Sequence, residues 1–425
     1  MRKGFPTHSY RDLFRTPGAL AFCAAAFLAR SGGAMMGVGI VLMVSMLYGS
    51  YGWAGGLTAA NGLAWGLGAA VLSRLVDRYG QARVMVPGAV VSSLGLTSLI
   101  VAAWLHAPVG VLFLPAIVTG AAAGSASALV RARWNHALSD PQQLHTAFAL
   151  ESTLDEVTYI VGPVVATALA TMVHPTAGLI APVVLGLGGG LWFYYGLRGS
   201  QPPVQKRPTS GDAQAGAARS ERFVLAFGGM APVVGVTALV GCSFGAIDVA
   251  TVAATAAWDA RPMAGVVLGA ISLGSALAGL AYGARAWKMS LPRRFLIGVA
   301  AYAGLMTLYL LAHQIAILTL CGFLAGSAVA PTLTNANSLV NVLVPKHRLT
   351  EGLAWVGTSI GIGASLGSSL AGRLIDSFGY VAGYLTSLAG GLCALAIALA
   401  GAKTVSRQAS APSWERTPLS SGEVY

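Results

Sequence analysis

Long apolar stretches alternate with short polar segments along the whole chain. Twelve such stretches can be counted, and most are near the roughly 20 residues that a helix needs to cross a bilayer. Their predicted ranges are 18–48, 54–73, 84–105, 109–130, 147–172, 176–197, 231–257, 264–284, 295–312, 315–338, 351–371 and 381–401. The first, third, fifth and ninth stretches are each followed by a very short turn, which makes them antiparallel to the next one. The pattern predicts an all-α membrane protein with twelve transmembrane helices.

Composition supports this interpretation. Of the 425 residues, 55% are hydrophobic and only 9% are charged, whereas a soluble domain carries about 25% charged residues. A soluble enzyme, a nucleic-acid binder and a disordered chain are therefore excluded as classes. The net charge of +12 does not indicate nucleic acid, because the basic residues fall in short segments between apolar stretches. The four cysteines lie inside apolar stretches without metal-ligand spacing, which is typical of small core side chains.

The positions of the basic residues predict the orientation of the chain. Of the 26 Lys and Arg residues, all but Arg30, Arg261 and Arg373 fall on one side of the predicted spans. Basic residues are enriched in cytoplasmic loops, so both termini are expected in the cytoplasm and the protein in the inner or plasma membrane. The first apolar stretch runs to Tyr48 and is followed by eleven more, so it is expected to be a retained helix and not a cleavable signal peptide.

A polar segment divides the chain into two six-helix halves. The expected division is a tail at 1–17, a first bundle at 18–197, a linker at 198–222, a second bundle at 223–402 and a tail at 403–425. The linker is rich in Gly, Pro and Gln, and the C-terminal tail is polar and expected to be disordered.

The two halves are related by an internal repeat. A shift of 210 superposes residues 53–75 on 263–285, and a shift of 205 superposes 144–162 on 349–367. Two such bundles around an axis normal to the membrane form a known transporter architecture.

The segment between the second and third spans resembles the loop signature of the major facilitator superfamily. That signature has a glycine, three residues, an aspartate, a basic residue, any residue, a glycine and two basic residues. Asp77, Arg78 and Gly80 match it, Ser73 replaces the first glycine, and Arg83 follows one place late. The resemblance, with the span count, the linker and the repeat, covers nearly the whole chain. It implies two pseudo-symmetric bundles around a central cavity, with Asp77, Arg78 and Gly80 in a cytoplasmic gate.

Three other segments resemble exporters of actinobacterial type within that superfamily. They are residues 29–35, 131–134 and 151–163. The last contains Gly162-Pro163, which is similar to the antiporter signature of the fifth span, although Thr158 stands where a glycine is expected.

Charged residues within the spans are the first candidates for function, because burying a charge in a bilayer is costly. Arg30 lies near the middle of the first span and is interpreted as a substrate-facing cation or as the counter-ion of an acid. Asp248, in the seventh span, is a candidate proton carrier, since burial favours the protonated carboxyl and a nearby arginine the ionised one. The structural alternatives are a snorkelling arginine and a hydrogen-bonded aspartate that closes the outer face.

Three acidic residues begin the fifth span. Glu151 and Asp155 are four residues apart and share a helix face, and Glu156 follows directly. The basic residues within reach are Arg78, Arg131 and Arg133. A cytoplasmic gate of ion pairs is the favoured interpretation, and proton coupling through Asp155 or Glu156 is the alternative.

Uncharged polar, aromatic and methionine side chains, which cost less to bury in a bilayer than charges do, complete the candidate site. Asn61 and Trp65 lie one turn apart in the second span, and Met35 and Met36 offer adaptable apolar contact in the first. These four are predicted to line the substrate cavity, although such residues also serve to hold helices together. Glu351 begins the eleventh span and is predicted to act as a gate or a helix cap.

Taken together, these patterns predict a secondary active transporter that exports a small, largely apolar compound in exchange for protons by alternating access. The alternative is an uptake symporter or facilitator for a small polar solute such as a sugar or organic acid. A membrane sensor or scaffold is less consistent with the buried charges. No enzymatic activity, cofactor, metal or nucleic-acid partner is expected, and the protein is expected to be a monomer in the lipid bilayer.

Overall fold

The computed structural model describes residues 13–203, 228–285, 287–345 and 349–410. In this part of the chain, twelve segments are helical, long and apolar enough to cross a membrane. In order, the elements are α2 (Ala19–Tyr48), α3 (Tyr51–Tyr79), α4 (Gln81–Trp104), α5 (Val109–Ala123), α6 (Ala126–Ala137), α7 (Pro141–Met172), α8 (Ala177–Leu191), η1 (Trp192–Gly196), η2 (Arg198–Ser200), α10 (Met230–Ala257), η4 (Arg261–Met263), α11 (Ala264–Gly283), α12 (Leu291–Met306), η5 (Thr307–Leu311), α13 (Ile315–Gly326), α14 (Val329–Leu343), α15 (Leu349–Phe378) and α16 (Tyr380–Ser410). The predicted all-α fold with twelve spans is confirmed.

Parts of the predicted tails and linker lie outside the described residues. These parts are residues 1–12, residues 204–222 of the linker, Lys346 and Arg348 among the basic loop residues, and residues 411–425.

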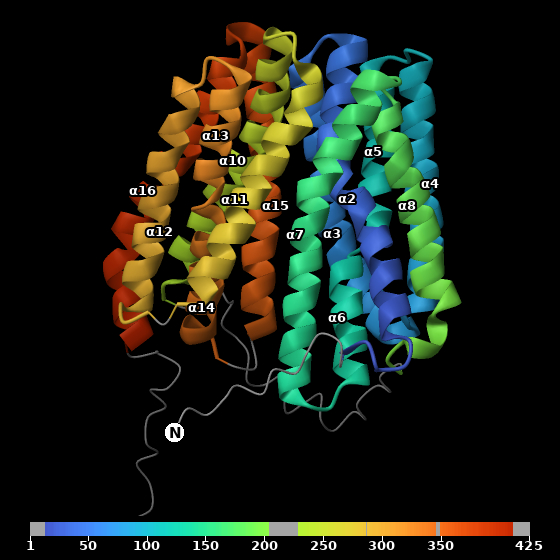
Figure 1. Cartoon of the computed structure of the whole chain (residues 1–425), viewed down its shortest axis with the longest axis vertical. Helices are drawn as coiled ribbons and strands as arrows, with labels where there is room; N and C mark the ends of the chain where they lie inside the picture. The colour runs from blue at the N-terminus through green and yellow to red at the C-terminus, as the bar shows by residue number, and fades with distance from the viewer. Residues whose placement is uncertain (1–12, 204–227, 286, 346–348, 411–425) are drawn as a thin grey trace, which may run out of the picture.

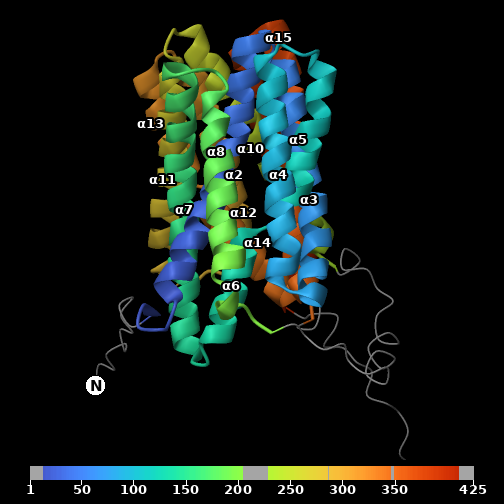
Figure 2. The same ribbon diagram turned by 90° about the vertical axis from the view of Figure 1, so that its right-hand side faces the viewer.

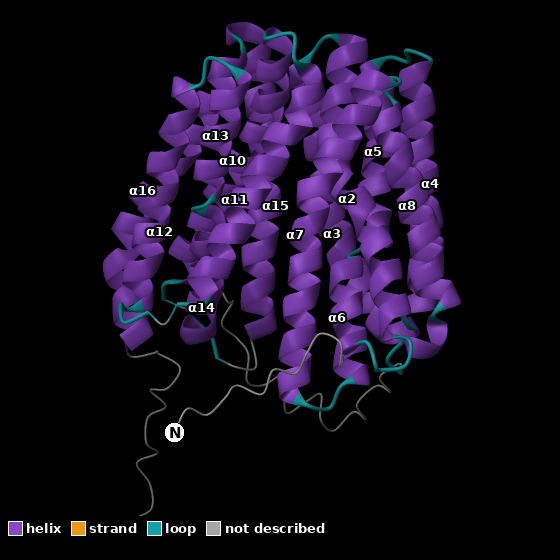
Figure 3. Cartoon of the chain, in the orientation of Figure 1, coloured by secondary structure: helices purple, strands orange, loops and turns teal. Residues whose placement is uncertain are grey.

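The helices form two halves that lie side by side, one from α2 to η2 and the other from α10 to α16 (Figure 1). Figure 3 shows helices and connecting loops throughout the drawn chain. We call the end where the described chain starts and stops the tail end, and the opposite end, with the turn at Gly49, the hairpin end. Figure 2 shows α6 at the tail end of the first half, beside the start of α7.

Several helices run further than the hydropathy pattern predicts. The second span continues to Tyr79 rather than ending at residue 73, so Asp77 and Arg78 lie on its last turn and not in a loop. Gly80, with φ 90°, ends that helix. The last helix likewise continues to Ser410, past the predicted bundle end at 402. Hydropathy falls where a helix leaves the bilayer, but the backbone hydrogen bonds of the helix continue into water.

Two spans are broken at equivalent places in the two halves. The fourth span is interrupted at Gly124, with φ 65°, and the Ser125 hydroxyl then caps α6 by accepting from Ala128 N at 3.4 Å. The tenth span is interrupted between Gly326 and Val329. Interrupted spans at corresponding positions of a repeat often line the binding site of a transporter.

The halves meet tightly near the hairpin end. A methyl group on Gly55 of α3 would collide with the Ser368 carbonyl oxygen of α15, and one on Gly372 with the Tyr51 carbonyl oxygen. Gly265 of α11 packs in the same way against the backbone of α7 at Pro163. Glycine permits this close approach of backbones. The two halves are therefore closed against each other at the hairpin end.

Candidate functional site

An ion-pair cluster joins the first, fourth and fifth spans inside the first half. Arg30 Nη2 lies 2.7 Å from Glu151 Oε2, and its Nη1 lies 3.1 Å from Asp155 Oδ1. Arg131 Nη2 lies 2.8 Å from the other oxygen of Asp155. Because Glu151 and Asp155 are one helical turn apart on α7, both reach the same guanidinium. Arg30, Arg131, Glu151 and Asp155 are called the ion-pair cluster below.

Glu151 is the most enclosed member of the cluster. Its side chain is 0% exposed. Its second oxygen, Oε1, accepts a hydrogen bond from Trp134 Nε1 at 2.9 Å and one from Cys23 Sγ at 3.1 Å. A buried carboxylate is tolerated when it is paired and hydrogen-bonded, and here both oxygens have partners.

Asp155 is more open and connects the cluster to its surroundings. The Ser127 hydroxyl donates to Asp155 Oδ1 at 2.8 Å, and Arg131 Nη1 donates to the Ser127 carbonyl oxygen at 3.1 Å. Asp155 is partly buried and is more accessible to water than Glu151.

Two further carboxylates of the spans, Glu156 on α7 and Asp248 on α10, are partly buried. Neither makes a hydrogen bond or ion pair within the described part of the chain. Tyr159 follows Asp155 by one helical turn on α7, and its side chain is exposed. Arg30, for which Asp248 was one possible partner, pairs with Glu151 and Asp155 instead.

Arg133, predicted to lie in the gate, is fully buried within its own half. Its guanidinium donates to Gln81 Oε1 at 3.0 Å, to the Leu197 carbonyl at 3.1 Å, to Ser200 Oγ at 2.8 Å and to the Phe193 carbonyl at 2.7 Å. It also stacks over the Phe193 ring at 3.8 Å. These contacts tie α6 to the end of the sixth span and give Arg133 a structural position.

The other gate candidates lie at the tail end. Asp77 and Arg78 are exposed, and the Arg78 guanidinium lies over the Tyr79 ring at 5.1 Å. Glu351 lies in the first turn of α15, where an acid interacts favourably with the helix dipole. No ion pair joins Arg78 to the α7 carboxylates in the described residues.

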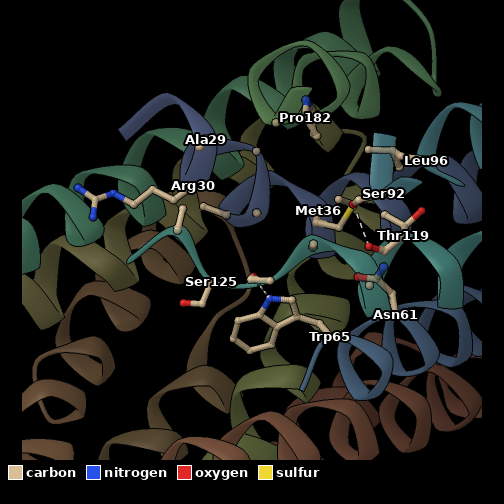
Figure 4. Close-up of a pocket in the computed structure, with 18 of the residues that line it drawn as sticks. Ala29, Arg30, Met36, Asn61, Trp65, Ser92, Leu96, Thr119, Ser125 and Pro182 are labelled. Atoms are coloured by element: carbon tan, nitrogen blue, oxygen red, sulfur yellow. Dashed lines mark hydrogen bonds between the residues drawn. The ribbon is translucent and has the colours of Figure 1, made fainter. Parts of the chain in front are cut away.

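A cavity of about 410 Å³ opens beside the ion-pair cluster (Figure 4). It is lined by α2, α3, α4, the α5–α6 break, α7 and α8 of the first half, and by Ala364 of α15. Of the predicted cavity residues, Asn61, Trp65 and Met36 line it, whereas Met35 is 1% exposed in the hydrophobic core. Met35 was placed incorrectly because neighbouring helix residues face different directions.

The predicted substrate-facing cation takes another orientation. Arg30 contributes to the cavity wall, but its guanidinium points away from Trp65 and Asn61 (Figure 4). Its charge is directed into the ion-pair cluster, which agrees with the interpretation as a counter-ion.

Sequence reasoning missed several residues that contact the cluster or the cavity. Ser127, Tyr159 and Ser92 line the cavity, and Cys23 bonds to Glu151. A serine, tyrosine or cysteine in a span has no distinctive pattern, so the sequence gives no signal for them. In the described residues, no group of three or more His, Cys, Asp or Glu side chains could hold a metal ion.

Comparisons with known proteins agree with this arrangement. The sequence pattern of the Major Facilitator Superfamily matches residues 20–253 and 233–422. No curated protein sequence matches the chain.

Solved structures with the same fold share little sequence with this chain. A mutant of the nucleoside transporter NupG has a TM-score of 0.71 at 14% identity, covering 90% of this chain and 99% of that one. A bacterial homologue of the iron transporter ferroportin, in an inward-facing state, has 0.68 at 15%, covering 90% and 98%. The POT family transporter PepTSo has 0.72 at 12%, covering 92% and 98%.

Proposed function

Because the chain belongs to the Major Facilitator Superfamily, we propose that it is a secondary active transporter that exports a small, largely apolar compound in exchange for protons. The family and the multi-pass helical fold give a membrane setting and a small-molecule substrate. Alternating access follows from the two-half architecture. The direction, the proton coupling and the apolar substrate are supported by the arguments below.

The observation that carries the proposal is the charge balance beside the cavity. α7 brings Glu151, Asp155 and Glu156 to a region with two nearby guanidinium groups, Arg30 and Arg131. Three ionised carboxylates exceed two cations, and an uncompensated charge within the bilayer is unfavourable. One proton on this group of acids removes the excess. The site thus has a place for a transported proton.

In the first half, Asp155 is the carboxylate that we propose takes up the transported proton. A proton there weakens its pairs with Arg30 and Arg131. Asp248, which has no ion-pair partner within the described residues, is the second proton carrier. Protonation and deprotonation of these two groups bias the two halves between their states.

Two residues connect the proposed substrate cavity to the proposed proton carrier Asp155. Ser127 lines the cavity and also donates to Asp155, and Tyr159 lines the cavity one helical turn after Asp155 on α7. A ligand that contacts Ser127 or Tyr159 alters the environment of Asp155. Such a shared contact is the coupling that exchange of substrate for protons requires.

The two ends of the bundle fit the roles of gates. The hairpin end is closed by glycine contacts, while Asp77 and Arg78 are exposed at the tail end. We assign the tail end to the cytoplasm from the excess of basic residues there, in the cell's inner or plasma membrane. Closure of the tail end then brings Asp77 and Arg78 towards the second half, near the start of α15 at Glu351. The protein is proposed to act as a monomer.

The cavity lining supports an apolar substrate over a polar one. Most of its lining residues are Gly, Ala or other apolar side chains, with Trp65 and Met36 among the largest. The similar solved structures are named as a nucleoside transporter, a homologue of an iron transporter and a peptide transporter, and they share only the fold with this chain. The resemblance of three segments to exporters adds to the case for outward transport.

The test is accumulation of lipophilic dyes and antibiotics in cells that make the protein, with and without a protonophore. Cells that make the Asp155→Asn variant at equal membrane abundance serve as the control. Export driven by protons predicts lower accumulation, reversed by the protonophore and absent in the variant. Equal accumulation across the panel, together with protonophore-sensitive uptake of a sugar or organic acid, would contradict the proposal and favour polar-solute symport.

A further inference from the structure

The cavity of about 410 Å³ described above, which Trp65 helps to line, lies mainly inside the first bundle. Ala364 of α15 is its one lining residue from the second half among the residues described. We propose that this cavity is a binding site for an uncharged aromatic molecule that donates hydrogen bonds. This inference rests on the proposed transport function, for which it names the substrate class and the site.

The charge of the cavity wall selects an uncharged ligand. Arg30 is the one residue with a formal charge among those that line it in the described part of the chain. Its guanidinium is turned away in Figure 4 and lies within 3.1 Å of both Glu151 and Asp155. An anion therefore finds no free cation among the described wall residues, and a cation finds no carboxylate there. Desolvating either charge without a partner is costly.

The hydrogen-bonding groups of the wall favour a ligand that donates. Thr58, Asn61, Trp65, Ser92 and Thr119 each donate a hydrogen bond to a backbone carbonyl oxygen, at 2.7 to 2.9 Å. These bonds use the hydroxyl hydrogens, the indole N–H and one of the two Asn61 amide N–H groups, and they leave lone pairs on the hydroxyl oxygens and on the Asn61 carbonyl oxygen. The hydroxyl groups of Ser93, Ser125, Tyr159 and Tyr194 also line the cavity and can both donate and accept. Over the whole wall, acceptors therefore outnumber donors.

The shape and the side chains favour a flat apolar body. Ideal Cβ positions on Gly33 and Gly186 meet no atom within 4 Å, and both residues line the cavity. Trp65 and Tyr159 supply aromatic faces, which bind other rings by offset or edge contacts. Met36 adds a flexible side chain that adapts to different ligands. Two fused rings with a hydroxyl group meet these requirements.

The direct test is equilibrium dialysis of the purified full-length protein in detergent against 2-naphthol, with empty micelles as the blank. We expect saturable binding of 2-naphthol at one site. 2-Methoxynaphthalene has the same rings but no donor, so loss of about one hydrogen bond should weaken its binding about tenfold. A trimethylammonium naphthalene should compete poorly. Equal binding of the hydroxyl and methoxy compounds, or no saturable binding of 2-naphthol, overturns the proposal.

Two glycines of α8 give a matched pair of variants that locate the site. Gly186 lines the cavity, whereas Gly188, two residues on, is exposed and outside the cavity lining. Neither would bring its Cβ within 4 Å of another atom. Gly186→Leu fills the cavity and should weaken 2-naphthol binding at least about tenfold, whereas Gly188→Leu should bind normally. Gly33→Val replaces Gly186→Leu if that variant does not fold.

The same measurements separate this inference from the proposed function. Dialysis needs neither a proton gradient nor export, so 2-naphthol binding without efflux contradicts export and leaves the site intact. Equal binding by the Gly186→Leu and Gly188→Leu chains, in a protein that still exports dyes, overturns the site and leaves export intact.

Discussion

The Asp376 carboxylate of α15 accepts a hydrogen bond from the Ser50 hydroxyl at 2.6 Å, across the boundary between the two halves. It also accepts from the backbone N–H groups of Tyr51 at 2.7 Å and Gly52 at 2.8 Å. These groups form the N-terminus of α3, where the helix dipole favours a negative charge. A single side chain of one half therefore caps a helix of the other and holds the hairpin end closed.

Removal of this cap should loosen the hairpin end. Asp376→Ala loses three hydrogen bonds to a charged acceptor, so the open population should rise at least about tenfold. Spin labels at Trp104 and Phe378, both exposed near the hairpin end, would report a longer-distance population. Ser377→Ala is the control, because the Ser377 hydroxyl donates to the Arg373 carbonyl oxygen of its own helix and, among the described residues, to no group of the other half. The same distance distribution in both variants would contradict a closing role for Asp376.

A glycine pair on α3 gives a second test of closure. An alanine at Gly55 collides with the Ser368 carbonyl of the other half, whereas one at Gly56 makes ordinary contact with Phe113 at 3.6 Å. Gly55→Ala should keep the halves apart and reduce transport at least about tenfold, because one methyl group is felt where backbones touch. Gly56→Ala should transport normally. Normal transport by Gly55→Ala would show that this contact is dispensable.

The pair of Arg30 with Glu151 predicts a strong energetic coupling. Arg30→Gln leaves Glu151 as a buried charge without its guanidinium and should destabilise the fold by about 3 kcal/mol. The double variant Arg30→Gln with Glu151→Gln removes both charges and should recover much of the loss. Thermal unfolding of the four chains in detergent measures the coupling. Additive losses in the double variant would mean that the pair contributes no interaction of its own.

Arg133 should not tolerate lysine. Its planar guanidinium donates to four oxygens and stacks on a ring, and an ammonium cannot reproduce that geometry. Arg133→Lys should lower the stability by about 3 kcal/mol. Arg198→Lys is the control, since Arg198 lies at 5.1 Å from the Tyr195 ring and should change stability by less than about 0.5 kcal/mol. Equal melting temperatures for the two variants would argue against the structural position of Arg133.

Asp248 should be required for the proton dependence of transport. Asp248→Asn cannot carry a proton, so dye efflux should lose its dependence on external pH and on the protonophore. Asp259→Asn is the control, because Asp259 lies in the turn after α10, with φ 51°, and asparagine tolerates that conformation. Efflux by Asp248→Asn with an unchanged pH dependence would remove Asp248 from the coupling.

Most of the fold could be predicted from the sequence because the bilayer imposes it. The apolar length of each span and the side of its basic residues are local properties, and they place all twelve helices. Helix ends are not set by hydropathy, which explains the polar extension of α3 to Tyr79. Asp376 carries a sequence signal of its own, since an acid in the last turn of a helix interacts unfavourably with the helix dipole unless another group pairs with it.

The site could be predicted only in part. The cost of a buried charge selected Arg30, Glu151, Asp155 and Asp248 from the sequence alone. Which of these charged residues form pairs depends on the rotation of α2 about its own axis relative to α7. No local pattern in the sequence indicates that rotation. The same holds for Met35, which faces the core while Met36 faces the cavity.

The position of Arg133 has a consequence for how the first bundle assembles while the chain is being synthesised. No carboxylate pairs with its guanidinium within the described residues. The guanidinium instead donates hydrogen bonds to uncharged oxygen atoms of Gln81, Phe193, Leu197 and Ser200. Three of these four partners are synthesised about 60 residues after Arg133 itself. While the nascent chain is shorter than that, the guanidinium must stay hydrated at the membrane surface. The first bundle therefore completes its assembly only after the end of the sixth span has left the translocation machinery.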